Sequence, residues 1–174
     1  MEYILKTPRL TLRPLRESDL LTTHAYASDR ATIQYMVYLP KDSLDETRTF
    51  LESVARQWES DTPEFYEFAI LCGDAHIGAI SVYFEGEPDE CELGWIIHRD
   101  WQGHGYATEA AEAVMQFAVE TLGCRRVFAC CDKRNAASAR VMQKLGMTLH
   151  SDTRLRRNRG EDHDVPEFIY ERWF

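Results

Sequence analysis

Residues 92–110 read ELGWIIHRDWQGHGYATEA, and this stretch decides the fold. Its first half is apolar, as expected of a buried strand, and from Tyr106 onward it opens a helix with an apolar face. Gly103 and Gly105 lie between the two. The N-terminus of a helix has free backbone N–H groups and a partial positive charge, and glycines let a ligand approach the backbone closely. The stretch therefore predicts a binding site for an anionic group such as a phosphate.

Two common phosphate-binding motifs do not fit this turn. A dinucleotide-binding motif needs Gly-x-Gly-x-x-Gly, but Thr108 stands where the third glycine is required. A nucleoside-triphosphate loop needs Gly-Lys-Ser/Thr after its four-residue gap, and that sequence is absent from the chain. A different class of phosphate-bearing ligand is therefore indicated.

The rest of the chain alternates strand and helix patterns around this stretch. Ser43 and Glu46 form a capping box that predicts a helix start, and Gly123 is a typical residue after a helix end. Apolar periodicity predicts the elements themselves. We expect strands over residues 10–15, 64–72, 77–84, 91–98, 127–131, 148–153 and 168–173, and helices over residues 18–27, 43–59, 106–122 and 135–146.

This order, β-α-α-β-β-β-α-β-α-β-β, predicts an α/β fold of the mixed α+β type. The strand–helix–strand unit from residue 91 to residue 131 requires a parallel pair inside an otherwise antiparallel sheet. We expect about seven strands with helices on both faces. At 174 residues, the chain is expected to form a single domain, residues 1–174.

Composition limits the possible functions. The chain has 20 Lys and Arg against 29 Asp and Glu, a net charge of −9, and a pI near 5.1. Nucleic acids and anionic membranes bind basic surfaces, so neither is an expected partner. The five cysteines lack the paired spacing of a zinc site, so no metal is expected. The sequence shows no secretory signal and no apolar stretch long enough to cross a bilayer, and we expect a soluble, cytoplasmic protein.

Four blocks of the sequence resemble one enzyme superfamily. Gln102, Gly105 and Ala107 match the Gln/Arg-x-x-Gly-x-Gly/Ala signature of the GNAT superfamily of acetyl-CoA N-acetyltransferases. The opening block, residues 6–15, resembles the RimJ/RimL-like branch of that superfamily, as do the stretch quoted above, residues 135–147 and residues 164–172. The resemblance covers essentially the whole chain, with the blocks in the expected order.

The resemblance implies how acetyl-CoA would bind as a co-substrate. In this superfamily the strand that matches residues 91–98 carries a bulge and separates from the strand that matches residues 127–131. The pantetheine arm of the cofactor lies in the V between these central strands and satisfies the free backbone groups. Carried onto this chain, the cofactor-binding residues are Ile96, Ile97, His98, Gln102, Gly103, His104, Gly105, Tyr106, Ala107, Thr108, Asn135 and Ser138.

The catalytic residues are less well determined by the sequence. A lysine-type amine has a pKa of about 10.4 and must lose a proton before it attacks. Glu92 is the first candidate for the base, Glu67 the second, and a water relay or no base at all is the other possibility. The tyrosine that protonates the leaving thiolate in many relatives is replaced by Met142, which cannot donate a proton. Ser138, one turn earlier, is the candidate acid, and a backbone N–H near Ile97 is the candidate donor to the thioester oxygen.

The acceptor is open at this stage. The resemblance implies acetyl transfer to an amine, either a protein N-terminus or a small molecule, by direct attack in a ternary complex. A non-catalytic acyl-CoA sensor or regulatory module is the alternative. The arginines between Arg154 and Arg159 either pair with acidic residues of their own hairpin or contact the acceptor or the cofactor's 3′-phosphate. We expect a monomer or a homodimer.

Overall fold

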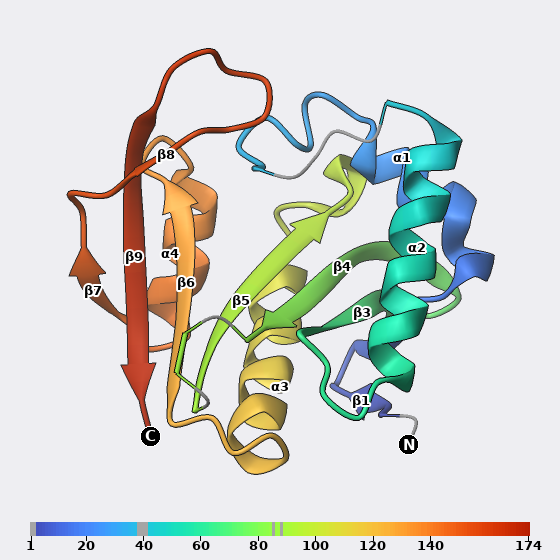
Figure 1. Ribbon diagram of the computed structural model, residues 1–174, viewed down its shortest axis with the longest axis horizontal. Coiled ribbons are helices and arrows are strands. Elements are labelled where there is room, and N and C mark those ends of the chain that lie inside the picture. Colours follow the sequence, from blue (N-terminus) through green and yellow to red (C-terminus); the bar gives the residue numbers. More distant parts are fainter. Residues whose placement is uncertain (1–2, 38–41, 85, 88) are drawn as a thin grey trace.

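The computed structural model describes residues 3–37, 42–84, 86–87 and 89–174, and they contain one nine-stranded mixed sheet (Figure 1). The strands are β1 (Leu5–Lys6), β2 (Leu10–Pro14), β3 (Phe65–Cys72), β4 (Ala75–Tyr83), β5 (Glu90–Ile97), β6 (Arg126–Asp132), β7 (Thr148–Ser151), β8 (Leu155–Arg156) and β9 (Val165–Trp173). The α-helices are α1 (Leu20–Ala27), α2 (Leu44–Glu59), α3 (Tyr106–Glu120) and α4 (Ala136–Lys144), and two 3₁₀ turns are η1 (Glu17–Asp19) and η2 (Arg99–Trp101).

The strand order is β1-β2-β3-β4-β5-β6-β9-β7, with β8 paired to β9. All neighbours are antiparallel except β5 and β6, which are parallel. Helices α1 and α2 cover one face of the sheet, called the front face here, and α3 and α4 cover the back face (Figure 1). The expected mixed sheet with helices on both faces is therefore confirmed.

Alternation along the strands divides the core between the two faces. In β3, Phe68 belongs to the large core on the α3 side, whereas Ala69 packs with Leu51 and Val54 of α2. In β5, Leu93 belongs to the same large core, and Ile96 joins a small front cluster with Tyr26 of α1. Successive strand residues point to opposite faces, so these core assignments fix the face to which every other side chain of β3 and β5 points.

Most predicted elements are confirmed within one to three residues. The Ser43 hydroxyl accepts a hydrogen bond from the N–H of Glu46 at 3.2 Å, as expected of the cap of α2. The reciprocal half differs from a capping box, because the Glu46 carboxylate accepts from the N–H of Asp42 at 2.8 Å. The two-residue strands β1 and β8 were not predicted, because pairing with β2 and β9 defines them rather than any local pattern.

The parallel strands β5 and β6 separate soon after they meet. They pair only at Glu90–Arg126, Cys91–Val127 and Glu92–Phe128, and beyond Glu92 they diverge (Figure 1). The predicted V between the central strands is therefore present. The predicted bulge is not, because the pairing of β5 with β4 is continuous from Glu92 to Ile97. The divergence comes from the paths of the two strands and needs no inserted residue.

Candidate active site

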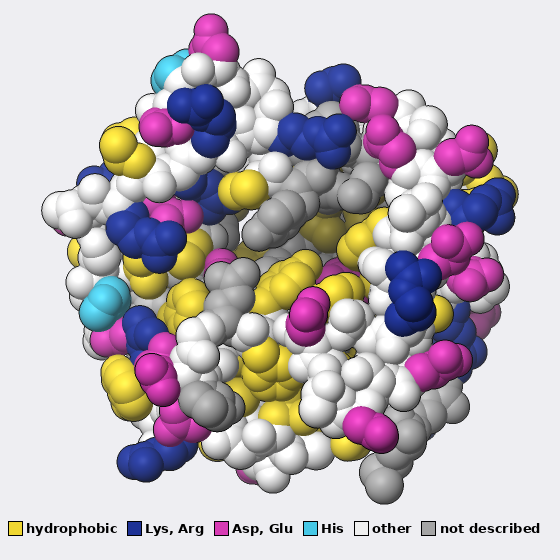
Figure 2. Space-filling model, in the orientation of Figure 1, with side chains coloured by type: hydrophobic (Ala, Val, Ile, Leu, Met, Phe, Trp, Pro, Cys, Tyr) yellow, Lys and Arg dark blue, Asp and Glu magenta, His cyan; other side chains and the backbone are white. Residues whose placement is uncertain are grey.

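A large cleft of about 1470 Å³ includes the V and opens onto the front face. Figure 2 shows this face hollowed near its centre, with hydrophobic side chains on the floor and charged side chains around the rim. Most of the residues singled out from the sequence line this one cleft, and they are Glu67, Glu92, Ile96, Ile97, Gln102, Gly103, Gly105, Tyr106, Ala107, Thr108, Asn135 and Ser138.

The start of α3 has free backbone donors beside the cleft. Gly103 and Gly105 adopt φ of +81° and +82°, the left-handed region in which a glycine is favoured. The N-cap residue of α3 is Gly105, which has no side chain to cap the helix. The side chains of Ser43 and Asn135, in contrast, cap α2 and α4. The first N–H groups of α3 are thus left without a capping side chain, which suits an anionic ligand.

Arg9 holds this glycine loop in place, a role that the sequence analysis missed. Its guanidinium donates to the carbonyl oxygen of His104 at 3.0 Å, pairs with the Glu109 carboxylate at 2.6 Å, and lies 4.6 Å from the centre of the Tyr106 ring. Thr7 also donates to Glu109, at 2.6 Å. These residues are about 100 positions apart, so only the folded chain reveals the contact.

Two backbone N–H groups of β5 point into the V. The N–H of His98 donates to Ile77 of β4 at 2.8 Å, and directions alternate along a strand, so the polar groups of Ile97 and Trp95 face away from β4. The side-chain amide of Gln102 donates to the carbonyl oxygen of Ile97 at 2.9 Å. The N–H groups of Ile97 and Trp95 therefore face the opening between β5 and β6, and Trp95 was not predicted to do so.

Glu92 and Ser138 lie on opposite sides of the sheet. Glu92 points to the front face, because its neighbours Cys91 and Leu93 belong to the back core, and it faces the Cys130 thiol. Ser138 lies on α4 at the back face, where its hydroxyl is close to the Cys131 thiol. The V is the opening between them.

Four residues singled out from the sequence differ in their relation to the cleft. His98 and His104 do not line the cleft; Nδ1 of His98 accepts from the N–H of Asp100 at 3.3 Å, and His104 stacks on Tyr106. Met142 is fully buried in the main core, so it does not share a cleft-facing position with Ser138. Asn135 caps α4 by accepting from the N–H of Ser138 at 3.1 Å and also lines the cleft.

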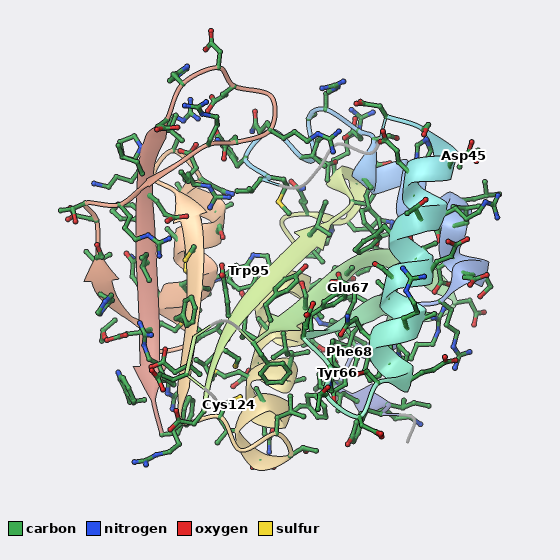
Figure 3. All side chains as sticks on the ribbon, in the orientation of Figure 1. Asp45, Tyr66, Glu67, Phe68, Trp95 and Cys124 are labelled. Carbon is green, nitrogen blue, oxygen red and sulfur yellow. The ribbon has the colours of Figure 1, made fainter. Side chains whose placement is uncertain are left out.

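Glu67 lies deep in the front half of the cleft, between β5 and α2 in Figure 3. Only 6% of its surface is exposed. Burial raises its pKa from 4.5 to about 8, although Ser81 and Tyr83 partly offset the shift by hydrogen bonding. Its carboxyl group is therefore mostly protonated at neutral pH.

The arginines of the last hairpin contact acids, as the first of the two interpretations predicts, and Arg154, Arg156 and Arg157 also line the cleft, as the second requires. Arg156 contacts Glu167 at 3.1 Å, and Arg157 contacts Asp164 at 2.8 Å. Arg156 also donates to the carbonyl oxygen of Tyr35 at 3.2 Å, and the N–H of Arg159 donates to that of Met36 at 3.0 Å. The hairpin is thereby joined to the loop after α1 across the front opening of the cleft.

The fold and this site are those of an acyl-group transferase. The family model described as "Acetyltransferase (GNAT) domain" matches residues 9–148. The chain belongs to this family and is an N-acetyltransferase, which confirms the resemblance noted from the sequence.

Three relatives illustrate the similarity. The chain is 29% identical to the uncharacterized N-acetyltransferase YnaD of Bacillus subtilis, over 81% of this chain and 80% of that protein. It is 25% identical to the spermidine N(1)-acetyltransferase of Escherichia coli K12, over 81% and 74%. The structure of RimL, a ribosomal L7/L12 alpha-N-protein acetyltransferase in complex with coenzyme A, superposes with a TM-score of 0.86 at 21% identity, over 98% of each chain. The likeness to RimL concerns the fold.

The described residues contain neither a candidate metal site nor a candidate membrane-spanning helix. No group of three or more His, Cys, Asp and Glu side chains there is arranged to hold a metal ion. No helix in the same residues is long and apolar enough to span a membrane.

The raised pKa of Glu67 predicts a pH-dependent stability. Between pH 4.5 and about 8 the folded protein binds a proton at Glu67 that the unfolded chain has released, so the free energy of unfolding falls as pH rises through this range. We expect Glu67 to account for a fall of about 2–4 kcal/mol between pH 5 and pH 8. Urea unfolding of the wild type and of Glu67→Gln at both pH values measures it. Equal pH dependence in the two proteins would contradict the assignment.

Proposed function

We propose that this protein transfers the acetyl group of acetyl-CoA to a primary amine by direct attack in a ternary complex. The observation that carries the proposal is the uncapped N-terminus of α3 beside the open V between β5 and β6. A pyrophosphate needs the first feature, and an amide-bearing arm needs the second.

The cleft suits coenzyme A in each of its parts. The N–H groups of Tyr106, Ala107 and Thr108 would bind the pyrophosphate at the positive end of α3. The N–H groups of Trp95 and Ile97 would donate to a carbonyl oxygen of the pantetheine arm or to the thioester oxygen. When bound, the cofactor supplies the activated acetyl group, and the protein supplies orientation and proton transfer.

The thiols near the cleft are poor candidates for an acetylated intermediate. Burial, with the neighbouring Glu92 carboxylate, raises the pKa of the Cys130 thiol. Burial likewise raises the pKa of Cys131, to about 11. A thiol that keeps its proton is a weak nucleophile, so the geometry favours direct attack by the amine.

Glu92 is the better placed of the two candidate bases. It lies on β5 at the last pair before the V opens, and its side chain lines the cleft on the front face. Glu67 lies two strands away on β3, and burial keeps its carboxyl group mostly protonated at neutral pH. We therefore assign proton removal from the amine to Glu92, directly or through a water.

The donor to the thioester oxygen and the acid that protonates the leaving sulfur are assigned from their positions around the V. As negative charge develops on the thioester oxygen, an N–H of β5 at Trp95 or Ile97 would stabilise it, since both donors are fixed and face the V. Ser138, on the opposite side from Glu92, would donate a proton to the departing sulfur. The acceptor class stays a primary amine, and two of the three named relatives are described as acetylating spermidine and a ribosomal protein N-terminus.

The glycine loop gives the first test of this proposal. In Gly105→Val, a β-branched side chain is forced to φ near +82°, so the loop must change shape. We expect coenzyme A affinity, measured by calorimetry, to fall at least about tenfold. Gly123→Val at the far end of α3 is the matched control, because Gly123 has φ of +76° but lies outside the cleft. Unchanged affinity in folded Gly105→Val would refute the placement.

The second test separates the base from the acid. We expect Glu92→Gln to lower kcat/KM at pH 7 by about 10²-fold or more, and by less as pH rises and free amine accumulates. Ser138→Ala should lower it less, because a thiolate of pKa about 8.5 leaves without full protonation. Thiol release measured between pH 6 and pH 10 decides between them. Near-full activity of Glu92→Gln at pH 7 would show that the base is another group.

The third test asks whether the acetyl group passes directly from acetyl-CoA to the amine or through an acetylated cysteine. Mass spectrometry of the protein mixed with acetyl-CoA alone should show no stoichiometric acetyl adduct, because the thiols that line the cleft stay protonated. An adduct on one cysteine that passes to an added amine would overturn direct transfer.

A further inference from the structure

Three buried oxygens with unsatisfied hydrogen-bonding capacity gather at the front end of the cleft. In the part of the chain that the structure describes, the buried side-chain atoms with no hydrogen bond of good geometry are Thr23 Oγ1, Tyr26 Oη and Glu67 Oε2. The Thr23 and Tyr26 hydroxyls are close enough to interact with each other, and each oxygen can still accept from a further donor. All three residues line the cleft and are at least nine-tenths buried. A buried polar atom without a partner costs about 1–3 kcal/mol. Three such atoms in one place indicate a binding pocket.

Glu67 stands out among the buried acids. The buried acidic side chains of the described residues are Asp19, Glu67, Asp132 and Glu167. Each of the other three forms an ion pair with an arginine, at 2.7, 2.6 and 3.1 Å respectively. Glu67 has no such partner within the described chain, and buried charges are rarely left unpaired. A cation bound from solution would supply the positive charge that Glu67 lacks.

The chemistry of the three oxygens selects the kind of cation. Thr23 and Tyr26 are three residues apart on one face of α1, and the Tyr26 hydroxyl interacts electrostatically with Glu67. A primary ammonium group has three N–H donors and no acceptor, which matches the two hydroxyl oxygens and Glu67 in its ionised form. The Glu67 carboxyl group would release its proton as the cation binds, because a nearby positive charge favours the ionised form. A carboxylate or phosphate group would favour the protonated form and gain no such attraction.

The pocket is too far from β5 to hold the reacting nitrogen. Glu67 pairs with Ser81, and Ser81 pairs with Gly94 of β5. Neighbouring strands are about 4.8 Å apart, so about 10 Å separate Glu67 from β5, measured along the sheet. Beside this line on the same face lie Ala79 of β4 and Ile96 of β5, which cluster with Tyr26 and offer an apolar surface to a methylene chain.

We propose that Thr23, Tyr26 and Glu67 bind a second, non-reacting ammonium group, so that the acceptor is an aliphatic diamine. This inference rests on the proposed acetyl transfer to a primary amine and narrows its substrate class. One nitrogen would lie at the V near Glu92, the other in the Glu67 pocket, and the carbon chain over Ile96. The reaction stays one acetyl transfer, in which the amine nitrogen forms the amide bond as the thioester C–S bond breaks.

The experiment compares diamines with monoamines of the same length. For the wild type, kcat/KM for 1,5-diaminopentane or 1,6-diaminohexane should exceed that for pentylamine or hexylamine by at least about tenfold, since a charge-assisted hydrogen bond contributes that much. Glu67→Gln should bring the ratio close to one while changing the monoamine rate less than about threefold. Tyr26→Phe should reduce the ratio in part. Glu64→Gln, a matched loss of charge at an exposed position of the same segment, should leave the ratio unchanged.

A binding measurement keeps the test independent of turnover. Calorimetric titration of the coenzyme A complex with 1,6-diaminohexane should show binding that Glu67→Gln weakens at least about tenfold. Absence of transfer to any amine, with this binding intact, would refute the proposed function but would still support the ammonium-binding pocket at Glu67. Transfer without a diamine preference, or diamine affinity equal in wild type and Glu67→Gln, would refute the pocket alone. A loss of monoamine transfer in folded Glu67→Gln by 10²-fold or more would also refute it, because Glu67 would then act on the reacting nitrogen.

Discussion

The shape of the cleft depends on the separation of β5 and β6. Two parallel strands that pair at only three positions leave buried backbone donors and acceptors open, and such groups need partners. The protein holds each strand from its outer side. β4 pairs with β5 from Glu92 to Ile97, and β9 pairs with β6 along its whole length. The opening is thus kept without a bulge, and its polar groups stay available to a ligand.

The opening also divides the chemistry between two faces. On the back face, the uncapped start of α3 and Ser138 of α4 suit the phosphates and the thiol of the cofactor. On the front face, Glu92 and the pocket around Glu67 suit a cationic acceptor. The two protons of an acetyl transfer, one lost by the amine and one gained by the thiolate, can therefore move on opposite sides of the sheet.

Local chemistry made most of the fold predictable, and long-range packing explains the rest. The cap at Ser43 and the turn at Gly103 and Gly105 depend on neighbours in sequence, so local motifs were enough to predict them. The contact of Arg9 with the glycine loop spans 95 residues and has no local signal. The two candidate bases look alike in sequence, because both are glutamates in apolar strands. Burial separates them, and burial depends on α1 packing over β4 and α2 packing over β3.

The stability of the front face argues that Glu67 was not placed there for packing. Ser81 and Tyr83 hydrogen-bond to it but supply no positive charge, and an apolar residue at this position would avoid both the desolvation that raises its pKa and the unpartnered oxygen. Asp19, Asp132 and Glu167 show how this chain treats a buried acid that serves the fold, since each is joined to an arginine. An acid that is buried, faces a cleft and has no such arginine lowers the stability of the empty protein. A bound cation removes this cost. Glu67 therefore lowers the stability of the protein without a ligand and raises its affinity for a cationic ligand.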